Sequence, residues 1–184
     1  MKQYLFTICL CFIATFTFSQ ENVIVGGKVI DPAQIERSQA NLATVNARLE
    51  ADPGNQEMLL AKTLILERLS VILGDSRAGS DYFSKAVGTI NSALEAEPYD
   101  FDLNFKAGQL FYKQALLIRN ITAQLDESDP SFSKHTEKFY NMMEGSLTYF
   151  QRAYGIDQGN PNLNAALKDA YQSLGMLDEA KTVK

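Results

Sequence analysis

The feature that most constrains the fold of this chain is a helix-ending motif that occurs three times. It reads LEADPGN at 49–55, LEAEPYD at 94–100 and, more weakly, YGIDQGN at 154–160. Proline and glycine after a run of helix-forming residues end a helix. A stop that recurs between helical stretches predicts stacked helix pairs, because each pair buries its apolar face against the next pair.

Residues 1–19 have the pattern of a secretory signal peptide. A short, positively charged start precedes a mostly apolar run from Tyr4 to Phe18. Thr17 and Ser19 supply small residues at the −3 and −1 positions of a cut after Ser19. The alternative is a transmembrane anchor, but this run is shorter than the roughly 20 apolar residues that span a bilayer.

Both cysteines of the chain, Cys9 and Cys11, lie within this segment. Ile8 and Leu10 precede Cys11 in place of the small residues of a lipidation site, so we expect no lipid anchor. Without cysteines the mature chain forms no disulfide, and its stability has to come from packing. Removing Lys2 reduces the 17 basic residues to 16 against 22 acidic ones, which changes the net charge from −5 to −6. An acidic chain without a basic stripe argues against nucleic acid and anionic membranes as partners.

The mature chain divides into a lead-in and a helical domain. Residues 20–31 hold an apolar stretch, Val23 to Val25, which we interpret as part of a flexible lead-in because no partner strand is evident beside it. From 32 to 184 the apolar residues recur at helical spacing. They predict an all-α domain of about seven helices, at about 32–51, 55–73, 81–97, 101–124, 131–156, 161–174 and 176–183. The second of these is apolar on most sides, which predicts burial between neighbours.

A recurring order of small and large residues runs through these helices. Near the C-terminus the order is Leu167, Tyr171, Gly175 and Ala180. Earlier in the chain the first-helix positions are filled by Ala107, Gly108 and Phe111, and the second-helix positions by Ser146, Phe150 and Ala153, and before them by Ala86, Ile90, Ala93 and Pro98. This order resembles the tetratricopeptide repeat family. The resemblance implies an α-solenoid of antiparallel helix pairs over 32–184, in which small residues let helices approach closely.

Two departures from the family pattern stand out. The stops recur after 45 and then 60 residues, whereas the family repeat is about 34 residues long. Lys62 and Thr63 occupy positions where the family has Leu and Gly, and Lys168 replaces a small residue. An unrelated helical bundle therefore remains the alternative fold.

In the family, the first helix of each pair lines a concave surface that binds a partner. The resemblance places Asp102, Phe105, Gln109, Tyr112 and Lys113 of one helix and Asn162, Ala165, Asp169 and Gln172 of another on that surface. Aromatic side chains at such places anchor peptides or helices. The alternative is that Phe105 and Tyr112 pack as core against the long helix at 131–156. A family branch clamps C-terminal carboxylates with Lys and Asn, but Phe105 and Gln109 replace those residues here, so we do not expect that ligand.

The sequence carries no Gly-rich phosphate loop, no paired histidines for a metal and no nucleophile motif. We expect the single histidine, His135, to be a surface residue. The prediction is a non-catalytic protein-interaction module, a scaffold or adaptor, with no cofactor, no metal and a protein partner. The start, with Phe-Ser-Gln at the cut, resembles exported proteins of Bacteroidota, which implies a periplasmic or outer-membrane-associated location in the cell envelope.

Three further hypotheses concern a bound ligand, catalysis and the C-terminal edge. The chain could instead carry a small apolar ligand in a closed cavity lined by Phe111, Leu117, Met142 and Met143. An enzyme would need acidic residues, Tyr or His135 to converge in a pocket. The last helix is too short to cover its neighbour, so we expect a contact site or dimer seam near Leu163, Leu167, Leu174 and Leu177.

Overall fold

The computed structural model describes residues 23–25 and 28–183, which form a two-stranded hairpin followed by seven helices. The strands are β1 (Val23–Val25) and β2 (Lys28–Ile30), and the helices are α1 (Pro32–Ala51), α2 (Gln56–Leu73), α3 (Arg77–Ala96), α4 (Phe101–Thr122), α5 (Phe132–Ile156), α6 (Pro161–Ser173) and α7 (Leu177–Thr182). The all-α class and the number of helices are confirmed. The predicted signal peptide at 1–19 lies outside the described residues.

The hairpin corrects one detail of the predicted lead-in at 20–31. No partner strand is evident in the sequence beside Val23–Val25, but Lys28–Ile30 pairs with it in antiparallel register, with Val23 opposite Ile30. The two strands therefore satisfy each other's backbone groups ahead of α1.

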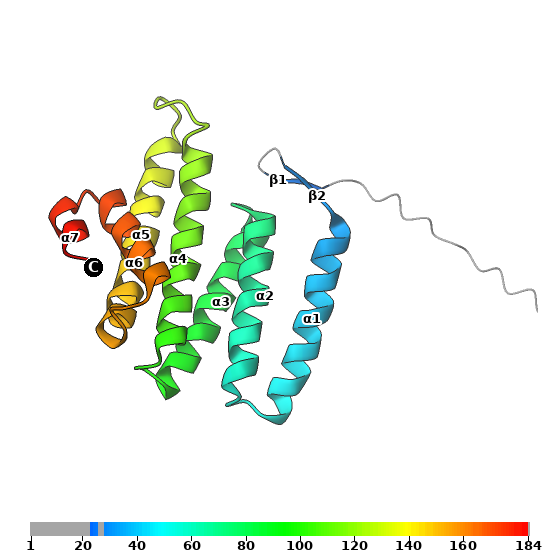
Figure 1. Cartoon of the computed structure of the whole chain (residues 1–184). Coiled ribbons are helices and arrows are strands. Elements are labelled where there is room, and N and C mark those ends of the chain that lie inside the picture. The colour runs from blue at the N-terminus through cyan, green and yellow to red at the C-terminus, as the bar shows by residue number, and fades with distance from the viewer. Residues whose placement is uncertain (1–22, 26–27, 184) are drawn as a thin grey trace, which may run out of the picture.

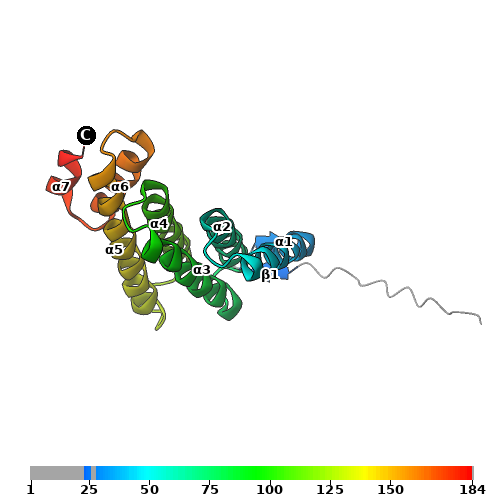
Figure 2. The same cartoon turned by 90° about the horizontal axis from the view of Figure 1, so that it is seen from below.

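The helices run up and down in chain order and form two layers (Figures 1 and 2). In Figure 2, α2, α4 and α6 lie in one layer and α3 and α5 in the other, with α1 and α7 at the two ends. Contacts between α2 and α4 complement those between consecutive helices. This is the predicted solenoid-like stack of antiparallel pairs.

The three helix-ending motifs share one hydrogen-bonding pattern. The residue after each helix donates its backbone N–H to the carbonyl four residues earlier. These donors are Asp52, Glu97 and Asp157, at 3.0, 3.1 and 2.9 Å. Three residues later, a side-chain oxygen accepts from the third backbone N–H of the next helix. These caps are Asn55, Asp100 and Asn160, at 3.0, 2.7 and 3.1 Å. Each of α2, α4 and α6 therefore begins at the same distance from the helix-ending motif that precedes it.

The core consists of two apolar clusters, and α4 contributes to both. The N-terminal cluster comprises Leu66, Ala86, Ile90, Ala93, Leu94, Leu103, Ala107 and Leu110. The C-terminal cluster comprises Phe105, Ala115, Met143, Leu147, Phe150, Ala153, Leu163, Leu167, Ala170 and Val183. All six second-helix residues that the sequence singled out on α3 and α5 are 0 % exposed: Ala86, Ile90, Ala93, Ser146, Phe150 and Ala153.

Two glycines allow α4 and α5 to pack closely. A Cβ atom on Gly108 would lie 2.3 Å from Cδ1 of Phe150, and one on Gly145 would lie 2.8 Å from Cδ1 of Phe111. The Phe111 ring also stacks on Tyr149, with ring centroids 5.6 Å apart. Each glycine is thus the space into which an aromatic ring of the facing helix fits, and no larger residue fits there without a shift.

The start of α3 differs from the prediction by four residues. Gly79 and its neighbours indicated a break, but they form the first turn of α3, whose cap is Ser76. The Ser76 hydroxyl accepts from the Gly79 backbone N–H at 3.1 Å. A Cβ on Gly79 would lie 2.2 Å from the carbonyl oxygen of Gly74. The glycine is therefore required by the tight turn from α2 and does not interrupt the helix.

The first two helices are less buried than the sequence predicts. On α1 the apolar residues at helical spacing are only half-buried along the whole helix: Ile35, Leu42, Val45 and Leu49. On α2, Leu64 and Val71 are 41 % and 43 % exposed, so the helix is not covered on all sides. Neighbouring helices therefore cover α1 and α2 only in part.

The C-terminal end is better covered than predicted. Gly175, at φ 75°, turns the chain after α6, and the backbone N–H of Met176 bonds to the carbonyl of Tyr171 at 2.9 Å. Helix α7 then returns so that Val183 packs in the C-terminal cluster. Leu163 and Leu167 are 0 % and 1 % exposed, so these two residues of the predicted seam belong to the core. Of the four seam residues, Leu174 is half-buried and Leu177 is 58 % exposed.

Candidate functional site

The exposed positions of α2, α4 and α6 form one surface, which we call the first-helix face. Residues at equal distances from equivalent caps point in the same direction, because the helical period is fixed. The predicted positions on α4 and α6 therefore have counterparts on α2, and these are Glu57, Leu60, Leu64, Glu67 and Arg68. The predicted partner-binding positions did not include α2, although the offset of 45 residues between the first two stops identifies these counterparts.

Two side-chain contacts connect the three helices of this face. Lys113 of α4 forms an ion pair with Glu67 of α2, with Nζ and Oε1 2.6 Å apart. The Glu67 side chain is only 11 % exposed whereas that of Lys113 is 52 % exposed, so the carboxylate is the buried half of the pair. On the other side of α4, the Tyr112 hydroxyl donates to Oδ2 of Asp169 on α6. The face is therefore a connected platform and not three independent helices.

Burial raises the pKa of Tyr112 to about 12, and the hydrogen bond and negative charge of Asp169 act in the same direction. The positive charge of Arg119 opposes this shift without cancelling it. Tyr112 therefore keeps its proton at neutral pH and acts as a hydrogen-bond donor.

Phe105 is not an exposed anchor, which corrects its assignment to the partner-binding surface. It is 8 % exposed, and its ring lies 5.7 Å from that of Phe101 and 5.9 Å from that of Phe150. The half-buried ring of Tyr112 lies 6.1 Å from Phe150 as well. Phe105 and Tyr112 thus pack against α5, as the alternative interpretation held.

The remaining predicted positions do reach the surface. Asp102, Lys113, Asn162, Ala165 and Gln172 are exposed. Asp169 and Gln109 are half-buried, and the Gln109 side-chain oxygen accepts from Lys106 Nζ at 3.0 Å. The face that the structure brings together is accordingly polar and charged, with Leu64 as its exposed apolar contribution from α2.

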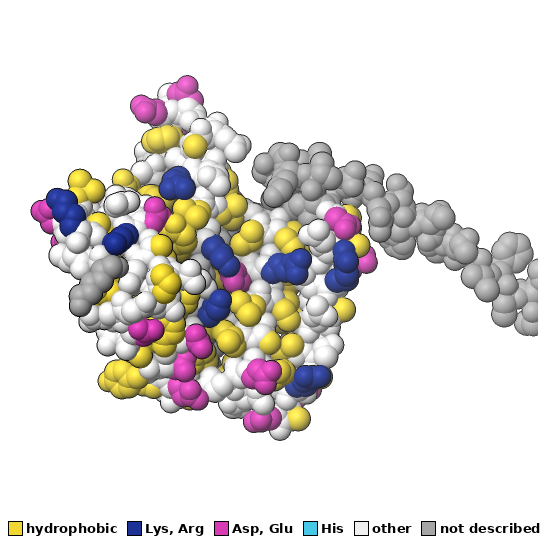
Figure 3. Space-filling view, in the orientation of Figure 1, with side chains coloured by type: hydrophobic (Ala, Val, Ile, Leu, Met, Phe, Trp, Pro, Cys, Tyr) yellow, Lys and Arg dark blue, Asp and Glu magenta, His cyan; other side chains and the backbone are white. Residues whose placement is uncertain are grey.

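The first-helix face carries charges of both signs. Figure 3, which views this side, shows Lys and Arg side chains over α1, α2 and α4, and several Asp and Glu side chains toward the lower edge. Arg68 of α2 and Arg37 of the neighbouring α1 line a polar hollow of about 270 Å³ together with Gln34, Ser38 and Asn41. An uneven charge pattern of this kind favours a partner of complementary charge pattern.

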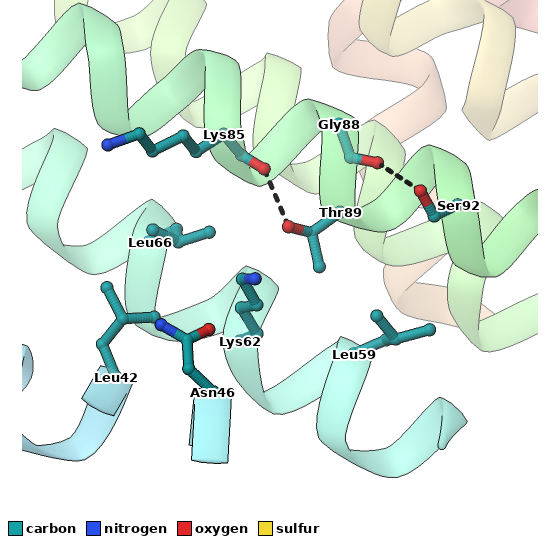
Figure 4. Close-up of a pocket in the computed structure, with 9 residues that line it drawn as sticks. All are labelled: Leu42, Asn46, Leu59, Lys62, Leu66, Lys85, Gly88, Thr89 and Ser92. Atoms are coloured by element: carbon teal, nitrogen blue, oxygen red, sulfur yellow. Dashed lines mark hydrogen bonds between the residues drawn. The ribbon is translucent and has the colours of Figure 1, made fainter. Parts of the chain in front are cut away.

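A larger hollow lies between α1 and α3, with α2 as its floor (Figure 4). Its volume is about 520 Å³. Leu42 and Asn46 come from α1, and Leu59, Lys62 and Leu66 from α2. The α3 wall consists of Lys85, Gly88, Thr89 and Ser92. We refer to these nine residues as the α1–α3 hollow.

A third hollow, of about 490 Å³, lies between the α3–α4 turn and the end of α5. It is lined by Pro98, Tyr99, Arg152, Gly155 and Ile156. Tyr99 is 85 % exposed and Ile156 is 42 % exposed. Two of the three helix-ending motifs therefore meet at an apolar surface.

His135 is not the isolated surface residue that the sequence predicted. Its side chain is 16 % exposed, and its Nε2 lies 2.9 Å from Oδ2 of Asp75, in the turn between α2 and α3. Its Nδ1 lies 2.9 Å from the carbonyl oxygen of Ser131, and Lys138 Nζ lies 2.5 Å from Asp75 Oδ1. Both ring nitrogens therefore lie within hydrogen-bond distance of oxygen atoms.

The carboxylate of this cluster is stabilised in its charged form. Burial raises the pKa of Asp75, but the hydrogen bonds and positive charges of Lys138 and His135 outweigh it, and the net shift is downward. The three side chains pair with one another and fix α5 to the α2–α3 turn. Their geometry accounts for a structural ion cluster, which needs no substrate to explain it.

Three of the four residues proposed for an apolar ligand cavity, Phe111, Met142 and Met143, pack against other side chains. Met143 is fully buried in the C-terminal cluster. The Phe111 ring is held between Phe83, at 5.4 Å, and Tyr149, at 5.6 Å. The three hollows described above are lined by other residues.

Within the part of the chain that the structure describes, no group of three His, Cys, Asp or Glu side chains is placed to hold a metal ion. No helix in that part has the length and apolar character needed to cross a membrane. Neither a protein-family model, nor a curated protein, nor a solved structure matches this chain. The likeness to tetratricopeptide repeats therefore stays a prediction carried by the residues.

Proposed function

We propose that this chain is a non-catalytic interaction module of a bacterial cell envelope, which binds a segment of a partner protein on the first-helix face. The observation that carries the proposal is the connected platform of α2, α4 and α6. Their equivalent exposed positions form one surface, and the Glu67–Lys113 and Tyr112–Asp169 contacts fix the three helices relative to each other. A preorganised surface binds a flexible segment at lower entropic cost than three mobile helices do.

The chemistry of this face supports recognition and not turnover. Four of its titratable groups are paired: Lys113 with Glu67, and a neutral Tyr112 with Asp169. Exposed Asp102, Gln172 and Leu64 offer a carboxylate, an amide and an apolar contact. Polar and apolar contacts around a rigid centre are the composition of a transient protein–protein interface.

The envelope location rests on the first residues of the chain. A cut after Ser19 releases a mature protein that begins at Gln20 and has no cysteine. Mass spectrometry of the protein from the periplasm of its own host measures this directly, and thiol labelling gives an independent readout. A mature mass that retains Cys9 and Cys11 contradicts the proposed export.

The test of the binding face is site-specific photocrosslinking in the native envelope. A photoreactive residue replaces Leu64, Asp102 or Gln172, one on each first helix, in otherwise wild-type protein. The matched control places it at Thr148, which is exposed on α5 in the other layer. We expect the three first-helix positions to capture the same partner segment and the Thr148 position not to capture it.

Two results contradict this proposal. One is capture of the same segment at Thr148 with equal yield, which removes the preference for the first-helix face. The other is failure of all three positions while the protein is folded and exported, because a segment that covers the face cannot avoid all three helices.

A further inference from the structure

The α1–α3 hollow lies on the other side of α2 from the first-helix face. Lys62 and Leu64 are two positions apart, which places them about 200° apart around the helix. Leu64 is exposed on the first-helix face, whereas Lys62 lines the hollow together with Leu59 and Leu66. A ligand in the hollow therefore uses a surface that the proposed function does not use.

A charged residue occupies a position of the hollow that is apolar in the other two helix pairs. Lys62 is the counterpart of Ala107 on α4 and Leu167 on α6, which are 0 % and 1 % exposed in the core. A lysine cannot be buried there without losing its hydration, so α1 and α3 do not close over it. On the α3 wall, a Cβ on Gly88 would meet no atom within 4 Å, which shows how open this side is.

The lining combines an apolar floor with a cationic rim. Leu59 and Leu66 of α2 form the floor, and Leu42 of α1 extends toward Leu66 (Figure 4). Lys62 and Lys85 line the hollow from α2 and α3, and no acidic side chain is among its nine lining residues. Within the described residues neither lysine forms an ion pair, although the whole chain carries a net charge of −5.

The remaining polar groups point to the same ligand chemistry. The hydroxyls of Thr89 and Ser92 donate to carbonyls of their own helix, at 2.8 and 3.1 Å. Hydrogen-bond donation into the hollow is therefore left to the Asn46 amide and the Lys62 ammonium, because the Lys85 ammonium turns toward the Tyr82 ring, 5.5 Å from its centroid. These are donors for an anionic acceptor, and a carboxylate near them is held by both charge and hydrogen bonding.

We propose that the α1–α3 hollow is a second docking site, which takes an acidic amphipathic segment of a partner protein. The segment places apolar side chains on Leu42, Leu59 and Leu66 and a carboxylate against Lys62, with Lys85 adding positive charge at the rim. The α3 wall from Lys85 to Ser92 extends about 10 Å, from the helical rise of 1.5 Å per residue. That length and a volume of about 520 Å³ suit two turns of helix or a few extended residues.

The experiment selects a random twelve-residue peptide library, displayed on phage, against the mature protein. Counter-selection uses Gly88→Leu, which fills the hollow from an exposed helix position where leucine is a better helix former than glycine. Gly88→Ala serves as the control that leaves the hollow open. Circular dichroism and thermal unfolding of each variant show whether the fold is kept.

We expect peptides enriched only on the wild type to combine apolar residues with Asp or Glu. We expect the affinity of these peptides to fall at least tenfold with Lys62→Glu or Lys85→Glu. It should change little with Lys134→Glu, which makes an equal charge change at an exposed position of α5. Equal enrichment on wild type and Gly88→Leu overturns the proposal, as does enrichment of basic peptides. Binding of dodecanoate with loss on Gly88→Leu, in the absence of selected peptides, assigns the hollow to a fatty anion and overturns it as well.

This proposal and the proposed function fail separately. Gly88→Leu alters the hollow alone, so photocrosslinking at Leu64, Asp102 and Gln172 is expected to be unchanged in that variant. Loss of those crosslinks in a folded Gly88→Leu protein contradicts the existence of two separate docking surfaces.

Discussion

Gly108→Ala tests the close packing that positions α4 against α5. The added Cβ would lie 2.3 Å from Cδ1 of Phe150, about 1 Å closer than the 3.4 Å at which ordinary contact begins. Phe150 is 0 % exposed, and its ring lies beside the rings of Phe105 and Tyr112, so it cannot turn toward solvent. The helices or the rings must therefore move.

The expected magnitude follows from two opposing effects. Replacing a helical glycine by alanine stabilises a helix by roughly 1 kcal/mol. Overpacking of a filled core destabilises by about 1–3 kcal/mol, and we expect the upper half of this range because the ring has no free space. The net loss for Gly108→Ala is then about 1–2 kcal/mol, which lowers the Tm by roughly 2–8 °C for a chain of this size.

Urea unfolding followed by far-ultraviolet circular dichroism measures this change. The control is Gly88→Ala, where a Cβ meets nothing within 4 Å, and we expect it to stabilise the protein by about 0.5–1 kcal/mol. In the double variant Gly108→Ala/Phe150→Leu the smaller side chain relieves the clash, so the two changes should cost less together than the sum of the single changes. The reasoning is refuted if Gly108→Ala is as stable as Gly88→Ala.

The other predictions concern the ionisable contacts. Lys113→Ala leaves the Glu67 carboxylate, which is 11 % exposed, without its partner and should cost about 1 kcal/mol of unfolding free energy, because the ammonium group is half-exposed. In urea unfolding, the exchanged pair Glu67→Lys/Lys113→Glu should recover part of this loss. Equal losses in the two variants would contradict the prediction. Tyr112→Phe should cost about 1 kcal/mol at neutral pH. Because the pKa of Tyr112 is raised from 10.0 to about 12, its contribution is complete below pH 10.0 and disappears as the pH rises through about 12, and an ultraviolet titration of the variant should lack the tyrosine that ionises last. The pKa of Asp75 lies below 3.8, so its contribution is present above pH 3.8 and lost as the pH falls through the lower folded value; the urea midpoint of Asp75→Asn should therefore fall less on acidification than that of the wild type, and parallel curves would show that Asp75 is not the linked group.

The parts of the fold that the sequence predicted well are those set by local signals. Helix α1 has the predicted bounds, because Asp31 caps it and Pro32 opens it. The small and large residues at 86, 90, 93 and at 146, 150, 153 are fully buried, because their helical spacing places them on one face. The Gly79 turn misled the prediction, since a glycine required by close backbone contact looks the same in sequence as one that ends a helix.

The parts that the sequence could not predict depend on contacts between distant residues. His135 pairs with Asp75, 60 positions away, and Lys113 pairs with Glu67 on a different helix pair. Neither pairing leaves a periodic pattern, so only the packing of α5 and α4 reveals it. The spacing of Phe105 fits both a groove residue and a core residue, and its burial follows from contact with the Phe150 ring of α5. Similarly, Lys62 appeared only as a mismatch in the sequence, and the structure places it in the lining of the α1–α3 hollow.

The most direct measurement of the central claim is paramagnetic relaxation from a spin-labelled partner segment bound to isotopically labelled protein. The segment is the one captured by photocrosslinking, made as a peptide with a nitroxide at its centre. The account predicts strong broadening of the amide signals of Asp102, Gln109 and Gln172, while Thr148 on α5 stays sharp. Broadening centred on α3 and α5, with the first-helix face unaffected, would contradict it.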